Sequence, residues 1–383
     1  MNDFSLINSI IDRDEFSCIV SLIDKNSLFA FSLTCKGSYN AVHELKEPIK
    51  TTFASLVSSN LLIKWAVSYG CPEPSQYAFA WGVEAAKGGH LDVLRWMRYN
   101  YSMEINAYTA EAAALGGHID VLCYLRMNGC NMDADTCAKA ALTGHLHVMQ
   151  WARANGCPWD KYTCASAAEG GHLSVLQWAR ANCCPWDVTT CMEAARGGHL
   201  TVLKWAVENG CKFNNEICQI AAIMGGRFEI LKWIHEKGYP WYDYEEQYTY
   251  VTVCNVAASN GHLHILKYLV EKGAKWNIDT CADAIAKGHL HIVEWLHANK
   301  CPLDEGCCNN AAVTGNLTIL KWLRKNGCPW DEVTCISAAN GGHLDILKWL
   351  RENGCPWDDR TTNIAKERGH VELLQWALDN GCP

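Results

Sequence analysis

One pattern of polar and apolar residues recurs along most of this chain. Each copy has a short alanine-containing stretch that ends in Gly, then a marker position and a longer apolar stretch. The marker residues are His90, His118, His145, His172, His199, Arg227, His262, His289, Asn316, His343 and His370. Seven of the ten intervals are 27 residues, and the others are 28, 28 and 35. A degenerate copy at Leu61–Trp65 and Gly70–Pro72 precedes them. Such regular spacing predicts stacked structural repeats.

The pattern inside one copy predicts two helices. Thr334–Ala339 reads as the start of a first helix with Thr334 as its N-cap, and Asn340–Gly342 ends that helix because Gly accepts positive φ. A second helix is expected from His343 to about Asn353. Its apolar residues fill an arc wider than one contact surface needs, so we expect each helix pair to pack between two neighbours. The predicted fold is an all-α solenoid.

The residues of this unit resemble the ankyrin repeat. The order T-x-x-x-A-A-x-x-G-H, with an apolar second helix and a final N-G, is present at Thr163, Ala167, Ala168, Gly171 and His172. The resemblance covers roughly residues 51–383, in about twelve short units. Cys164 replaces the Pro of the ankyrin motif, and the unit is about six residues short, which implies a tight turn in place of the ankyrin β-hairpin finger. The Trp- and Cys-rich short unit is similar to arrays of amoeba-infecting giant viruses and some protists.

Residues 1–48 lack the repeat and resemble an F-box. The stretch around Leu28, with Phe31, Leu33 and Cys35, is similar to the second half of that motif, whereas the expected Leu-Pro opening is absent. The resemblance implies binding to the small adaptor of cullin-RING ubiquitin ligases. The adaptor-binding residues it implies are Leu22, Ile23, Leu28, Phe31, Leu33 and Cys35. The alternative is an N-terminal helical cap that seals the first repeat.

Composition narrows the possible functions. The formal net charge is −8 and no dense Lys/Arg cluster occurs, which argues against a nucleic-acid partner. No apolar run approaches 18 residues, so we expect no membrane span. The N-terminus has neither a basic start nor an unbroken apolar stretch, so the 22 cysteines are expected to be mostly reduced, in the cytoplasm or nucleus.

The recurring His and Cys do not predict chemistry. There is no C-x-x-C hook for zinc, and Arg227 and Asn316 stand where most units have His, so we interpret that His as a hydrogen-bonding residue of the turn. The cysteines read as small packing residues, and the second-helix tryptophans, such as Trp178, as core. No nucleophile elbow, P-loop or dinucleotide motif occurs. We therefore expect neither an enzyme nor a cofactor or metal site.

Binding is expected where the repeat is irregular. Residues between the turn Asp and the Thr, such as Lys161 and Tyr162, vary between units and would line the concave side of an ankyrin-like stack. The 35-residue interval adds an aromatic and acidic insertion at 239–250. Its expected partner-binding residues are Trp241, Tyr242, Tyr244, Glu245, Glu246 and Tyr248. The partner would be a protein with a basic patch; alternatively the insertion folds onto the adjacent helices. The chain is thus predicted to be a substrate receptor linking a target to a ubiquitin ligase, or alternatively a plain binding scaffold or decoy.

Overall fold

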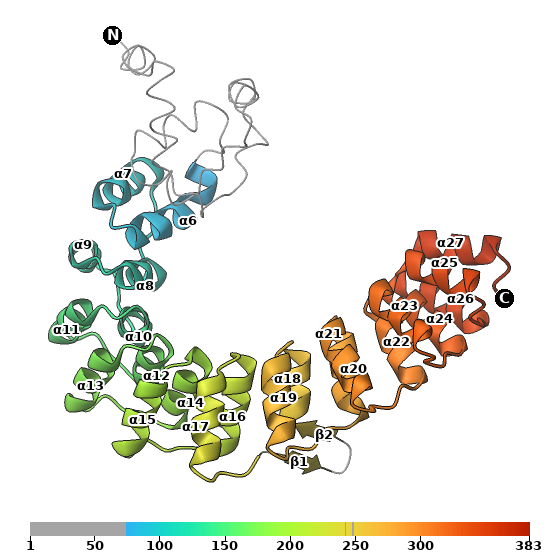
Figure 1. Cartoon of the computed structure of the whole chain (residues 1–383). Helices are drawn as coiled ribbons and strands as arrows, with labels where there is room; N and C mark the ends of the chain where they lie inside the picture. The colour runs from blue at the N-terminus through green and yellow to red at the C-terminus, as the bar shows by residue number, and fades with distance from the viewer. Residues whose placement is uncertain (1–73, 242, 247–248) are drawn as a thin grey trace, which may run out of the picture. The chain divides into compact units, whose positions relative to one another are not determined.

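The computed structural model describes residues 74–241, 243–246 and 249–383. Residues 1–48 and the degenerate copy before Pro74 lie outside the described part. The described chain forms consecutive helix pairs (Figure 1). The first helices of the pairs are α6 (Pro74–Lys87), α8 (Ala107–Gly116), α10 (Ala134–Leu142), α12 (Lys161–Glu169), α14 (Val188–Gly197), α16 (Asn215–Met224), α18 (Val253–Ser259), α20 (Ile278–Ala286), α22 (Glu305–Val313), α24 (Glu332–Gly341) and α26 (Asp359–Arg368). The second helices are α7 (Leu91–Tyr101), α9 (Ile119–Met127), α11 (Leu146–Ala154), α13 (Leu173–Ala181), α15 (Leu200–Glu208), α17 (Phe228–Glu236), α19 (Leu263–Glu271), α21 (Leu290–Ala298), α23 (Leu317–Lys325), α25 (Leu344–Glu352) and α27 (Val371–Asp379).

The repeat of α10 and α11 shows why the sequence folds into a pair. The carboxylate of Asp133 accepts hydrogen bonds from the amides of Asp135 (3.1 Å) and Thr136 (3.4 Å), which caps α10. Gly144 then adopts φ +77°, and the His145 amide donates to the Ala140 carbonyl at 2.9 Å. The chain reverses there and α11 begins.

The N-cap differs from the expected residue. The N-cap of α24 is Asp331, which lies three residues before Thr334. Its carboxylate accepts a hydrogen bond from the Val333 amide at 3.1 Å. Thr334 lies inside the helix and is fully buried. The aspartate is the cap because its carboxylate reaches the unpaired amides of the first turn, and this leaves the threonine for packing between repeats.

The core lies between the two layers of helices. In the repeat of α12 and α13, Ala167 and Ala168 of the first helix and Val175, Leu176 and Ala179 of the second are fully buried. Trp178 is only half-buried, as are its counterparts Trp151, Trp205 and Trp233, so these indoles lie at the border of the core and not inside it as expected. The small alanines let neighbouring first helices approach closely.

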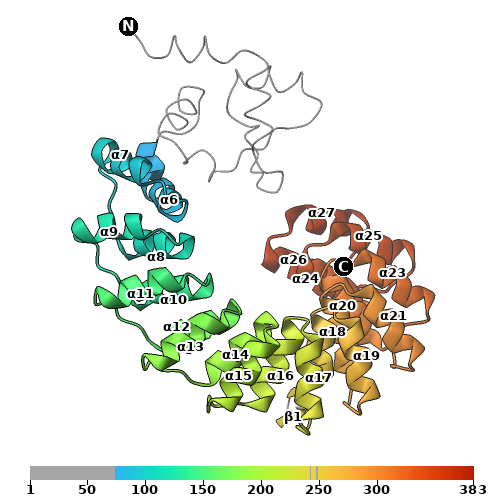
Figure 2. The same ribbon diagram turned by 60° about the vertical axis from the view of Figure 1, so that its left-hand side comes forward.

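The chain divides into two compact units, residues up to Thr190 and residues from Cys191 onward. In the first unit, first helices pack on first helices, as α6 on α8, α8 on α10 and α10 on α12. Figure 2 shows these even-numbered helices on one side of that stack and the odd-numbered ones on the other. The second unit repeats the arrangement from α16 to α26. This stacking confirms the predicted helical solenoid. Among the described residues, no helix is both long and apolar enough to cross a membrane.

A two-stranded antiparallel hairpin adds to the helices in the second unit. Strands β1 (Asp243–Glu246) and β2 (Thr249–Thr252) pair between α17 and α18, with Asp243 opposite Thr252 and Glu246 opposite Thr249 (Figure 1). Residues 237–252 separate these two helices, whereas 182–187 suffice between α13 and α14. The long interval therefore carries a finger that the neighbouring turns lack.

Candidate functional site

Several marker residues hydrogen-bond to the preceding repeat. The His118 Nε2 lies 3.1 Å from the Lys87 carbonyl oxygen, and His289 and His343 make the same contact with Ser259 and Val313 at 3.1 and 3.2 Å. Arg227 replaces the imidazole and its Nε donates to the Arg196 carbonyl at 3.0 Å. The interpretation of this position as a hydrogen-bonding residue of the turn is therefore confirmed, and its acceptor belongs to the preceding repeat.

The turn cysteines also bond to the preceding repeat. The Cys157 thiol donates to the carbonyl of the cap residue Asp133 at 3.1 Å, and Cys328 donates to Asp304 at 3.1 Å. The same thiol meets the helix cysteine twenty positions earlier in sequence, as Cys308 Sγ and Cys328 Sγ do at 3.4 Å in the buried interior. In the repeat that contains Cys184, a hydrogen bond between the Cys184 and Cys164 thiols, and then burial, raise the pKa of Cys184, so the Cys184 thiol stays protonated.

Tryptophans and arginines complete the contact between repeats. The guanidinium of Arg180 stacks 4.3 Å from the Trp186 ring centroid and donates to the Cys184 carbonyl. Turn tryptophans then meet second-helix tryptophans of the following repeat edge to face, as Trp159 and Trp178 do at 5.7 Å. The regular His, Cys, Trp and Arg positions are thus occupied by packing, which leaves the irregular positions for recognition.

The insertion is anchored where it leaves α17. Trp241 stacks on His235 (ring centroids 4.7 Å apart, interplanar angle 3°), and its indole N–H donates to the Lys272 carbonyl at 3.1 Å. The buried Gln219 of α16 donates to the Pro240 carbonyl at 2.7 Å. Trp241 therefore occupies the turn-tryptophan place of its repeat, and it fixes the base of the finger.

The other end of the insertion is held by buried polar groups. The Thr252 hydroxyl caps α18 by accepting from the Asn255 amide at 3.2 Å, and it donates to the Asn255 side-chain oxygen at 2.8 Å. The Thr280 hydroxyl of the next repeat donates to that same oxygen at 2.7 Å. Burial raises the pKa of Asp283 beside this group. Both ends of the hairpin are thus fixed to helices of neighbouring repeats.

The structure describes only some of the predicted site residues. Tyr244, Glu245 and Glu246 lie on β1, opposite Val251, Tyr250 and Thr249. Tyr242 and Tyr248 lie outside the described residues, as do Leu22, Ile23, Leu28, Phe31, Leu33 and Cys35. The described part of the insertion forms a β-hairpin, and its base at Trp241 packs on the adjacent helices.

In each of the two units, the variable residues at the starts of the first helices form a further surface, which we call the first-helix face of that unit. Tyr162 of α12 is 54% exposed on it. Several charges here pair across repeats: Lys161 Nζ lies 2.8 Å from Asp187, and the Arg360 guanidinium lies 3.2 Å from Glu332. Both pairs are partly exposed, so they contribute little to stability. The Ala165 side chain of α12 is buried and is not part of this surface.

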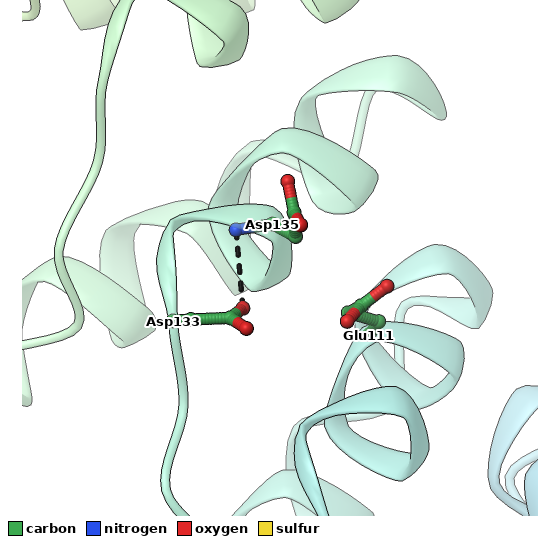
Figure 3. Close-up of side chains that lie close together, drawn as sticks. All are labelled: Glu111, Asp133 and Asp135. Atoms are coloured by element: carbon green, nitrogen blue, oxygen red, sulfur yellow. Dashed lines mark hydrogen bonds between the residues drawn. The ribbon is translucent and has the colours of Figure 1, made fainter.

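Three carboxylates meet on the first-helix face. Glu111 of α8, the cap Asp133 and Asp135 of α10 each have an oxygen within 4.8 Å of the others (Figure 3). Burial, and then repulsion from Asp133 and Asp135, raise the pKa of Glu111. The repeat pattern of the sequence does not reveal this cluster, because its residues come from different positions of two successive repeats. Stacking α8 on α10 brings them together.

Comparison with known proteins supports the repeat assignment. A family model for ankyrin repeats (3 copies) matches residues 191–280. The crystal structure of the human ASB11 ankyrin repeat domain shares 21% sequence identity at a TM-score of 0.40, over 50% of this chain and 98% of that one. No curated protein matches the chain. Residues 191–280 match the ankyrin-repeat model, and the described residues have the fold of an ankyrin-like helical-repeat solenoid.

Proposed function

We propose that this chain is a protein-recognition scaffold whose partner contacts the hairpin of residues 239–250 and the first-helix face. Repeat solenoids bury their regular positions between units and present the irregular ones to ligands. Here the regular His, Cys and Trp positions bond neighbouring repeats, as His118 does with Lys87 and Cys157 with Asp133. The proposal includes no reaction catalysed by the chain itself.

The observation that carries this proposal is the anchoring of the hairpin. Gln219 holds its base through the Pro240 carbonyl, and Thr252 and Asn255 hold its end. A finger fixed at both ends loses little conformational entropy when it binds, which favours affinity. Glu245 and Glu246 give it negative charge, and we therefore propose a partner with a basic patch.

The finer proposal is a substrate receptor. The F-box resemblance of residues 1–48 supports docking of this segment to the adaptor of a cullin-RING ubiquitin ligase, in the cytoplasm or nucleus. The array would then hold the target protein. The alternative is a plain scaffold or decoy in which residues 1–48 only cap the first repeat. Binding of the intact protein to the purified adaptor tests this. Binding that is lost in the Leu28→Asp/Phe31→Asp double variant supports the substrate-receptor function, and no binding by the intact protein supports the plain scaffold or decoy.

Deletion of residues 242–248 tests the role of the hairpin. The deletion shortens the finger beyond Trp241, so the repeats keep their contacts and far-UV circular dichroism should be unchanged. We expect a partner isolated from the native cell, then purified, to lose binding to the deletion variant. A matched control is Tyr99→Ala, which removes an 89% exposed ring on the second helix α7. Unchanged binding by the deletion variant would remove the hairpin from the contact surface.

A further inference from the structure

Exposed aromatic rings line the first-helix face of the first unit. Tyr108 is 64% exposed, Tyr162 54% and Phe79 45%, and the Phe79 and Tyr108 rings meet edge to face at 6.2 Å. Tyr108 and Tyr162 occupy the same place in their repeats, immediately before the buried Thr109 and Thr163. Large exposed rings in one column are typical of protein contact surfaces.

The residue between the two tyrosines decides the charge of what can bind there. In the intervening repeat the same place holds Asp135, which forms the acidic cluster with Glu111 and Asp133 (Figure 3). The three carboxylates lie within 4.8 Å of one another and so repel one another when charged; burial first, and then this repulsion, raise the pKa of Glu111, and Lys139 lowers it only in part. A cation placed among the three would relieve the repulsion. The column therefore presents an aromatic ring, a negative cluster and a second aromatic ring on successive repeats.

We propose that this face binds an extended basic segment of a partner protein, with one Arg among Glu111, Asp133 and Asp135 and an apolar side chain on each of Tyr108 and Tyr162. This inference rests on the proposed function and names the partner chemistry of a second surface, separate from the hairpin. Arg fits better than Lys because its planar guanidinium donates to two carboxylates at once.

The repeat spacing fixes the spacing of the bound residues. Packed helices lie about 8–10 Å apart. A segment in the extended polyproline II conformation advances about 3.1 Å per residue with three residues per turn, so side chains three residues apart point to the same side. Residues three apart in an extended segment therefore reach successive repeats. The fitting pattern is an apolar residue, an Arg three residues later and an apolar residue three residues after that.

The test uses the full chain and synthetic peptides. A fluorescein-labelled peptide with Leu, Arg and Leu at this spacing is titrated with protein and followed by fluorescence anisotropy. We expect saturable binding that weakens as salt rises. Moving the Arg by one residue, or replacing it with Glu, should weaken binding about tenfold or more, and Lys should bind several-fold more weakly than Arg. These peptides share length and labelling, so they serve as matched controls.

Protein variants locate the site. The Glu111→Gln/Asp135→Asn double variant and the Tyr108→Ala/Tyr162→Ala double variant should each bind the Arg peptide about tenfold more weakly. Asp120→Asn and Tyr99→Ala, on the second helices α9 and α7, should bind as the wild type does. Circular dichroism of each variant checks folding. The inference is overturned if the wild type does not bind saturably, if position and charge of the Arg make no difference, or if the α7 and α9 variants lose as much affinity.

A divalent cation is the competing occupant, and calcium chloride alone is its probe. The inference is overturned, and the cluster is a metal site, if calorimetry shows micromolar calcium binding that is lost in Glu111→Gln/Asp135→Asn and the Arg peptide does not bind. The hairpin deletion separates this inference from the proposed function. The deletion variant should bind the peptide as the wild type does. If the wild type does not bind the peptide but the deletion still abolishes partner capture, the first-helix face is excluded as a binding surface and the proposed function of the hairpin stands.

Discussion

Two glycines in one repeat allow the contact between repeats to be measured. Gly144 (φ +77°) precedes His145, and Gly156 (φ +81°) precedes Cys157, so an alanine at either position is forced into the same left-handed backbone conformation. A Cβ at Gly144 would lie 2.6 Å from the His172 Nδ1 of the next repeat, whereas a Cβ at Gly156 would meet nothing within 4 Å. The two substitutions therefore differ in the contact with the next repeat.

The expected magnitudes follow from these two terms. The left-handed conformation costs an alanine about 1–2 kcal/mol, and this applies to Gly156→Ala and Gly144→Ala alike. Crowding against His172 adds about 1–3 kcal/mol for Gly144→Ala. Replacing His172 by Ala should remove that added cost, so the double variant Gly144→Ala/His172→Ala should be destabilised by less than the sum of the two single variants.

The measurement is urea unfolding of all four variants beside the wild type, followed by circular dichroism. Repeat arrays can unfold in parts, so hydrogen exchange of α10–α13 provides the local free energy of opening. Equal destabilisation by Gly144→Ala and Gly156→Ala, with no coupling to His172, would refute the account of how adjacent repeats are joined.

Three further predictions concern single contacts. Burial, and next the charge of His147, lower the pKa of His145 from 6.5. As the pH falls, His145 therefore binds a proton more readily in the unfolded chain than in the folded one, and the folded state loses stability as the pH falls through and below 6.5. The His145→Asn variant should show a smaller change in urea midpoint between about pH 7.5 and 5.5. Arg180→Lys removes the guanidinium stack on Trp186 and should cost about 1 kcal/mol, read from the urea midpoint; no change would show that the stack is energetically neutral. Gln219→Leu removes the buried donor to the Pro240 carbonyl, which keeps its hydrogen bond from Asn215 (3.1 Å), and should cost about 1 kcal/mol. Hydrogen exchange should become faster in the hairpin and stay unchanged in α10–α13; unchanged exchange in the hairpin would exclude this anchor.

The sequence predicts the repeated elements well because each repeat carries its own start, stop and packing signals. The Gly before each marker position ends the first helix, and the substitution of Arg227 for His indicates a hydrogen-bonding role that the structure confirms. The periodic apolar residues predict that each helix pair packs between two neighbouring pairs. The structure agrees, since α10 packs on α8 on one side and on α12 on the other.

Contacts between different positions of neighbouring repeats could not be predicted from the period. Comparing equivalent cysteines 27 residues apart misses the actual partners, Cys308 and Cys328, because the turn cysteine reaches back to the preceding first helix. The same reason hides the meeting of Glu111 with Asp133 and Asp135. The β-pairing of Asp243–Glu246 was also missed, since its aromatic and acidic residues do not alternate with apolar ones.

The central claim is that partners contact the first-helix face and the hairpin, while the second helices serve packing. Oxidative footprinting of the complex with a purified native partner tests it most directly. We predict protection of Tyr108, Tyr162 and Tyr244, with Tyr99 and Met127, which are 89% and 87% exposed on α7 and α9, oxidised as in the free protein. Protection of Tyr99 and Met127 with unchanged oxidation of the other three would contradict the claim.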